Sequence, residues 1–114
     1  SLHTPATPET KNIINSETLK LFPKHSVFVN TSRGSTVDDD ALIEALKNKK
    51  IYGAGLDVFN NEPNLNKRYV ELDNCFLLPH VGSATHETRL AMSMLAVNNL
   101  KCFFSNKPLL SEVD

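Results

Sequence analysis

Three short apolar runs, each closed by polar or turn-forming residues, constrain the fold of this chain more than any other feature. The runs at residues 27–29, 51–59 and 75–78 are rich in β-branched or aromatic side chains, and the first suits a strand buried on both faces. Helical spacing of apolar residues follows at 41–46 and recurs at 85–104. The order strand, helix, strand, loop, strand, helix predicts an α/β fold with a mostly parallel sheet.

Each predicted helix has a plausible start. Ser16 is the expected N-cap of a short helix that Pro23 stops, and one of the aspartates 38–40 caps the next helix. Thr85 caps the long final helix, which is expected to run to about Phe104. The chain begins with Ser1 rather than Met, and residues 2–5 read like the end of a strand. We therefore expect the chain to be a piece of a longer protein.

Composition excludes several classes of function. The 114 residues carry 12 basic and 13 acidic side chains, so no basic field exists to hold nucleic acid or an anionic membrane. No apolar run reaches the about 20 residues needed to span a bilayer, and the first ten residues lack the apolar core of a secretory signal. Two cysteines are too few for a disulfide scaffold. We therefore expect a cytoplasmic protein that binds neither nucleic acid nor membrane.

Three chemically distinct side chains follow the predicted strands. Ligands of parallel α/β sheets lie outside the carboxyl ends of the strands, which directs attention to Arg33, the 57–62 segment with Glu62, and His80. A guanidinium can hold the carboxylate and carbonyl of a 2-oxo acid by paired hydrogen bonds. A histidine can give the proton that the carbonyl oxygen needs when hydride arrives, and a glutamate beside it favours the protonated imidazole.

Two other chemistries fit these residues less well. Cys75, His80 and His86 do not have the spacing of a zinc site and lack a fourth ligand, so no metal is expected. A hydrolase would pair Ser32, Ser35 or Ser83 with His80 and Glu62, but the sequence contains no Gly-x-Ser-x-Gly turn.

A family resemblance joins these separate observations. Three blocks carry it: Asn-Thr-Ser-Arg-Gly at 30–34, Gly-Ala-Gly-Leu-Asp-Val-Phe at 53–59 with Glu62-Pro63, and Pro-His-Val-Gly-Ser at 79–83. Together they resemble the D-isomer-specific 2-hydroxyacid dehydrogenases over nearly the whole chain. The resemblance implies that Arg33, Glu62 and His80 are the catalytic residues, and that residues 1–84 form the C-terminal half of the NAD(P)-binding domain. Residues 85–114 would be a crossing helix and a tail towards the substrate domain.

The resemblance also implies contacts with NAD or NADP. The expected cofactor-binding residues come from four segments of the chain: Thr4, Pro5, Thr31, Ser32, Arg33, Asp57, His80, Gly82 and Ser83. The glycine-rich turn that cradles the pyrophosphate is absent, as is the residue that selects NAD or NADP. We therefore expect the isolated chain to bind dinucleotide weakly, to turn over little, and to leave a sheet edge and an apolar face uncovered.

The segments 82–100 and 107–113 resemble the glyoxylate/hydroxypyruvate reductase branch of the family. The family resemblance implies the second half of a Rossmann-type parallel sheet in an oxidoreductase that acts on small 2-oxo acids and is dimeric when full-length. The branch resemblance implies reduction of glyoxylate or hydroxypyruvate. The alternative from another class is a catalytically inactive NAD-sensing or interaction module on the same fold.

Overall fold

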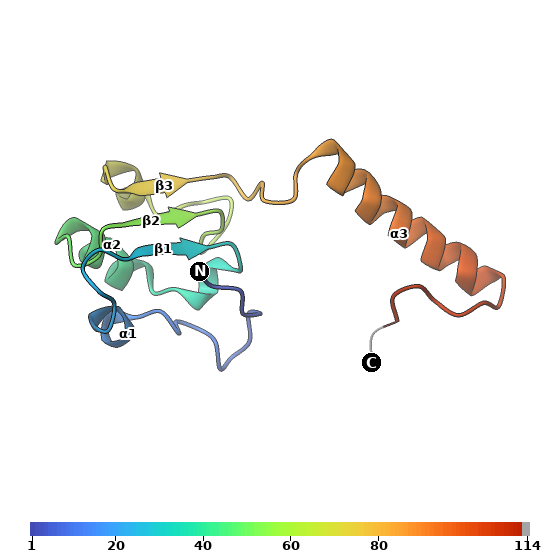
Figure 1. Ribbon diagram of the computed structural model, residues 1–114, viewed down its shortest axis with the longest axis horizontal. Helices are drawn as coiled ribbons and strands as arrows, with labels where there is room; N and C mark the ends of the chain where they lie inside the picture. The colour runs from blue at the N-terminus through green and yellow to red at the C-terminus, as the bar shows by residue number, and fades with distance from the viewer. Residues whose placement is uncertain (113–114) are drawn as a thin grey trace. The chain divides into compact units, whose positions relative to one another are not determined.

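The computed structural model describes residues 1–112, and the chain divides into two units, Ser1–His80 and the part from Val81 onwards. The first unit contains the sheet and the short helices, and the second contains one long helix (Figure 1). The elements are α1 (Ser16–Lys20), β1 (Val27–Asn30), η1 (Gly34–Thr36), α2 (Asp39–Lys47), β2 (Gly53–Leu56), η2 (Lys67–Glu71), β3 (Cys75–Leu77) and α3 (His86–Phe104). The predicted α/β class and the element order are confirmed.

The three strands form one parallel sheet in the order β1-β2-β3 (Figure 1). Val27 pairs with Gly53, and Ala54 pairs with Cys75, so the amino ends of the strands are aligned. Leu2 forms a further parallel bridge beside β1, where its N–H donates to the Val29 carbonyl. Because all strands run the same way, the segments that follow them leave the sheet at one edge.

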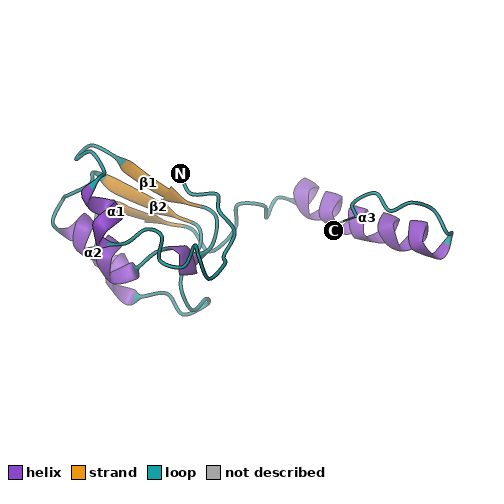
Figure 2. Ribbon diagram, turned by 90° about the horizontal axis from the view of Figure 1, so that it is seen from below, coloured by secondary structure: helices purple, strands orange, loops and turns teal. Residues whose placement is uncertain are grey.

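One face of the sheet is covered by α1 and α2, as Figure 2 shows. The core lies between these helices and the sheet, and the loop after β2 adds Tyr69 to it. Asp38 caps α2 through a hydrogen bond from the Ala41 N–H, which confirms one of the three predicted caps. The fully buried large side chains are Leu42, Ile43, Leu46, Ile51, Tyr69, Asn30 and Thr36.

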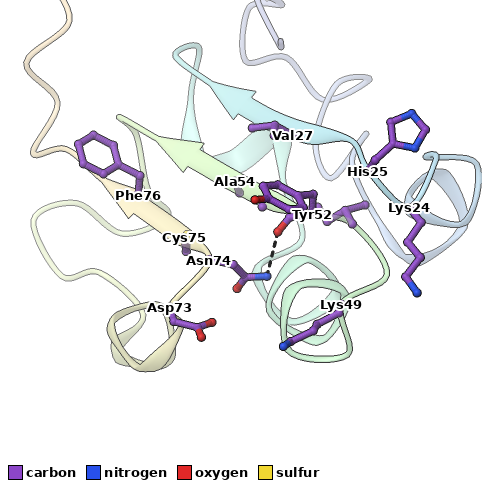
Figure 3. A pocket seen from close by; sticks show the side chains of 12 residues that line it. Lys24, His25, Val27, Lys49, Tyr52, Ala54, Asp73, Asn74, Cys75 and Phe76 are labelled. Atoms are coloured by element: carbon purple, nitrogen blue, oxygen red, sulfur yellow. Dashed lines mark hydrogen bonds between the residues drawn. The ribbon is translucent and has the colours of Figure 1, made fainter.

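The prediction that β1 is buried on both faces was wrong for this chain. Val27 is 57% exposed and Phe76 is 67% exposed. The physical reason is that no helix within Ser1–His80 covers the second face of the sheet. An open hollow of about 820 Å³ lies at the amino ends of the strands, lined by Val27, Tyr52, Ala54 and Phe76 among others (Figure 3). The predicted uncovered apolar face is thus present.

Some element ends differ from the sequence prediction. Asn15, not Ser16, caps α1, because its side chain accepts hydrogen bonds from the Glu17 and Thr18 N–H groups. The strand expected over 51–59 is limited to Gly53–Leu56, since Tyr52 and Gly53 donate to Ser26 before the strand and the chain turns away after Asp57. The expected loop at 60–73 contains η2.

The second unit is dominated by α3, which begins and ends as predicted. Thr85 caps it by accepting from the Thr88 N–H, and the helix continues to Phe104. None of its residues is buried. No helix in the described part of the chain is both long and apolar enough to cross a membrane. The division between units falls after His80, four residues before the domain boundary expected from the sequence, which stays a prediction.

Candidate active site

Three loops leave the carboxyl edge of the sheet, and each carries one of the predicted catalytic residues. Arg33 lies three residues after the end of β1, Glu62 lies in the loop after β2, and His80 follows β3. The parallel topology places these loops side by side, which is the arrangement that ligand sites of open α/β sheets use.

Glu62 and His80 are in direct contact. His80 Nδ1 lies 2.7 Å from Glu62 Oε2, and the Phe59 N–H donates to Glu62 Oε1 at 2.8 Å. Both carboxylate oxygens therefore have a partner. The pKa of Glu62 is held below its usual value by the hydrogen bonds from His80 and from the Phe59 N–H, and further by the positive charges of His80 and Arg33. The charge of Arg33 therefore acts on this carboxyl, in the same direction as the contact with His80.

His80 adopts an unusual backbone conformation. Its φ angle is +55°, in the left-handed region that non-glycine residues seldom occupy. Strained conformations of this kind concentrate at functional sites, where the surroundings hold them. The imidazole side chain is 48% exposed.

The loop that carries Arg33 is fixed by a buried asparagine. Asn30, at the end of β1, is 1% exposed, and its side chain accepts from the Ser32 N–H and donates to the Arg33 carbonyl. The Thr36 hydroxyl donates to the same carbonyl at 2.6 Å. Arg33 itself is exposed, and its Nη1 donates to the Ser32 carbonyl at 2.6 Å. The backbone is thus held firmly while most donors of the guanidinium face solvent.

A close contact joins the Arg33 loop to the Glu62 loop. A Cβ on Gly34 would lie 1.9 Å from the carbonyl carbon of Phe59, so only glycine fits there. Asn60 adds a hydrogen bond from its Nδ2 to the Val37 carbonyl at 3.1 Å. These contacts set the spacing between the guanidinium and the carboxylate.

The predicted cofactor-binding residues fall into three groups. Thr4, Pro5, Thr31 and Ser32 line one hollow of about 530 Å³ with Arg33. Asp57 is buried immediately after β2, and its N–H donates to the Asn30 carbonyl. Gly82 and Ser83 belong to the second unit, where both are exposed. The structure therefore brings the first group together beside Arg33.

The sequence prediction missed the residues that hold the predicted catalytic residues in place. Asn30 was grouped with the turn residues, although a polar residue that closes an apolar run is a signal of a buried polar contact. The Phe59 N–H, which holds Glu62, leaves no signal in the sequence, since any residue except proline offers the same donor. Tyr69, which is buried beneath the Glu62 loop, lies in a segment that the sequence assigned to a polar loop.

The structure does not support the two alternative chemistries, a zinc site and a serine hydrolase. Among residues 1–112, no three His, Cys, Asp or Glu side chains lie close enough together to hold a metal. Burial raises the pKa of the Cys75 thiol to about 11, which disfavours the thiolate that metals bind. Ser32 is buried, and its hydroxyl accepts the Arg33 N–H at 2.6 Å, so it is not an exposed nucleophile.

Comparison with known proteins adds independent findings. Residues 1–82 match the family described as D-isomer specific 2-hydroxyacid dehydrogenase, NAD binding domain. A glyoxylate reductase of Thermococcus litoralis is 50% identical over 103 residues, which are 90% of this chain and 31% of that protein. A hydroxyphenylpyruvate reductase of Plectranthus scutellarioides is 48% identical over 109 residues, 96% of this chain and 35% of that protein.

A solved structure extends the similarity to three dimensions. The NADPH-dependent glyoxylate/hydroxypyruvate reductase of Sinorhizobium meliloti, crystallised with NADP and malonate, matches with a TM-score of 0.91 and 47% identity. The match covers 97% of this chain and 35% of that one. The chain thus spans about a third of the length of these relatives. Relatives with different named substrates are about equally similar, so similarity alone does not select the substrate.

Proposed function

Because the chain belongs to the D-isomer-specific 2-hydroxyacid dehydrogenase family, we propose that it is part of an enzyme that reduces a small 2-oxo acid with hydride from NADH or NADPH. The proposed substrates are glyoxylate and hydroxypyruvate, by analogy with the reductases of T. litoralis and S. meliloti. The observation that carries the proposal is the hydrogen bond between Glu62 and His80, formed within the electrostatic reach of Arg33.

Arg33 is proposed to hold the substrate. Its guanidinium uses one donor on the Ser32 carbonyl, and its remaining donors can hydrogen-bond a carboxylate and the adjacent carbonyl oxygen. The positive charge also stabilises the negative charge that develops on that oxygen during reduction.

His80 is proposed to give the proton, and Glu62 to orient the imidazole. Since Nδ1 faces the Glu62 carboxylate, Nε2 is the nitrogen that would protonate the substrate oxygen. The contact between Nδ1 and the carboxylate fixes the orientation of the ring. In the reverse reaction the neutral imidazole takes the proton from the hydroxyl group.

The residues beside Arg33 fit a dinucleotide. Thr4 and Thr31 line a hollow of about 530 Å³, and hydroxyl side chains offer donors and acceptors that suit ribose, phosphate and carboxamide groups. Asp57, Gly82 and Ser83 are proposed to add contacts near the nicotinamide. When bound, NADH or NADPH supplies the hydride. Both cofactors remain in the proposal, since the family domain is described as NAD binding and the S. meliloti enzyme was crystallised with NADP.

The test is a pair of histidine variants in the full-length protein that contains this chain. His80→Ala is expected to lower kcat for glyoxylate or hydroxypyruvate by about 10²–10⁴-fold, the usual contribution of a general acid, as followed by NADH or NADPH absorbance. His25→Ala is the matched control, because His25 lies at the opposite, amino-terminal edge of the sheet. Equal activity of both variants would remove His80 from its proposed role. Nucleotide binding without turnover in the unmodified protein would favour the NAD-sensing or interaction module.

We further propose that the full-length protein is a cytoplasmic homodimer, in which residues 85–114 form the crossing helix and tail. The apolar side chains exposed along α3 support burial of this helix in a larger assembly. Sedimentation of the full-length protein tests the dimer, and a monomer at micromolar concentration would contradict it.

A further inference from the structure

The loop that carries Glu62 needs an anchor outside the catalytic residues. Glu62 is exposed, so side-chain packing does not hold it in place. Its orientation depends on the Phe59 N–H on one side and His80 on the other. The position of the Phe59 backbone therefore decides whether the carboxylate faces the imidazole.

Tyr69 is the buried side chain beneath this loop. It is 1% exposed, and its ring lies 6.5 Å from that of Phe59, centroid to centroid, with the planes tilted by 56°. The Tyr69 hydroxyl donates to Asp39 Oδ1 at 2.9 Å, which ties the loop to the first turn of α2. Burial and the Asp39 carboxylate raise the pKa of Tyr69 above its usual range, so the hydroxyl stays protonated and remains a donor.

Arg68 adds a second attachment to the same helix. Its guanidinium contacts Asp40 at 2.5 Å and Glu44 at 3.1 Å. Both pairs are largely exposed, so each contributes little to stability by itself. Their effect is to restrict the rotation of η2 over α2, because two carboxylates on successive turns hold one planar group.

We propose that Tyr69 is a positioning residue for the reaction, acting through Phe59 to keep the Glu62 carboxylate directed at His80. The effect of Tyr69 on the reaction rests on the proposed function. The effect of Tyr69 on the orientation of Glu62 rests on these contacts alone. The chain of contacts runs from Asp39 through the Tyr69 and Phe59 rings to the Phe59 N–H, Glu62 and His80.

The test follows the Phe59 amide proton of the 114-residue chain by NMR while pH is varied. Because this proton is hydrogen-bonded to Glu62, its chemical shift titrates with the carboxyl group, whose charged neighbours are His80 and Arg33. In the unmodified chain the midpoint is expected below 4.5, the ordinary value. In Tyr69→Leu the amplitude is expected to fall and the midpoint to rise towards 4.5.

Three further variants keep the outcome decisive. Tyr69→Phe retains the ring and loses only the bond to Asp39, so a smaller change in the same direction is expected even if Tyr69→Leu does not fold. Tyr52→Leu replaces an exposed tyrosine at the other end of the sheet and should leave the titration unchanged. Leu19→Ala weakens the remote core beneath α1, which controls for loss of stability alone. Unchanged titration in the folded Tyr69 variants would overturn the proposal.

The catalytic consequence is measured separately in the full-length protein. Tyr69→Phe is expected to lower kcat by about tenfold or less with little change in KM, because misplacement of a catalytic pair mainly affects the chemical step. If the Phe59 titration moves but no 2-oxo acid is reduced even by the unmodified protein, the positioning role stands and the proposed function fails. If activity is present and the titration does not move, the positioning role fails alone.

Discussion

Residues 1–80 and the helix α3 use apolar side chains in opposite ways. In the first unit they are directed inward, and Leu42, Leu46 and Ile51 are almost completely buried. In α3 not one residue is buried, although Leu, Met, Val and Phe occur along its whole length. The contrast teaches that a helix can be fully specified by local sequence while its apolar surface remains available for contacts that the described residues do not supply.

The apolar residues of α3 do not gather on a single stripe. Leu90, Met94 and Val97 share one side of the helix, whereas Met92 and Phe103 lie on another. A helix that is apolar on several sides is ordinarily enclosed by its surroundings. We therefore expect α3 to be covered in the full-length protein, and its contribution to the stability of this chain to be small.

The largest expected effect is the difference in stability loss between a core substitution in the first unit and a substitution in α3. Leu42→Ala, in the core beneath α2, is expected to lower the free energy of unfolding by about 2–5 kcal/mol, because it removes buried methyl groups and leaves a cavity. Leu95→Ala, in α3, is expected to change it by less than about 0.5 kcal/mol, as is usual for exposed positions. Urea unfolding followed by circular dichroism measures both. Similar losses in the two variants would break the comparison.

A second variant tests the contact between the two loops of the candidate active site. Gly34→Ala is expected to cost about 1–3 kcal/mol, because the new Cβ would overlap the Phe59 carbonyl and force the two loops apart. Gly55→Ala is the matched control, since its nearest neighbour is a Val29 methyl group at an ordinary 4.0 Å. Equal stability of the two variants, measured by the same urea titration, would contradict the close contact.

The exposed surface of α3 predicts self-association of the isolated chain. Leu95→Glu is expected to weaken it by about tenfold or more, since an apolar side chain contributes about 1.5–3 kcal/mol when it is buried. Asn98→Glu adds the same charge without removing an apolar group and is expected to have little effect. Sedimentation over a range of concentrations measures both variants. A chain that stays monomeric at high concentration would show that this surface is tolerated in water.

The smallest expected effect is the pH dependence that Glu62 gives the first unit. Its pKa is lowered in the folded chain, so its contribution to stability is present above the usual value of 4.5 and is lost as pH falls through the lowered one. Because the pair with His80 is exposed, the contribution at neutral pH is at most about 1 kcal/mol. Glu62→Gln should therefore be less stable than the unmodified chain at pH 6, and the difference should shrink as pH falls below 4.5. A difference that does not change with pH would assign the effect to packing.

Local patterns predicted most elements but not their surroundings. Thr85 and the residues after it specified α3 from cap to end, because helix capping and propensity act within a few residues. The same kind of reasoning placed β1 and β3 but wrongly predicted that β1 is buried on both faces, although Val27 is exposed. Burial depends on which other segments cover a face. The prediction that Ser16 caps α1 was wrong, because the Asn15 side chain accepts from the first N–H groups of the helix.

The sequence by itself determined the α/β order, the helix α3 and the family, because short motifs and hydrophobic periodicity are local properties of the chain. Only the tertiary structure decided that Glu62 faces His80, that Gly34 lies against Phe59, and that Tyr69 lies beneath the loop between them. These contacts join residues from different strands and loops. Their geometry follows from the parallel register of the sheet and from close packing, which no separate segment of the sequence encodes.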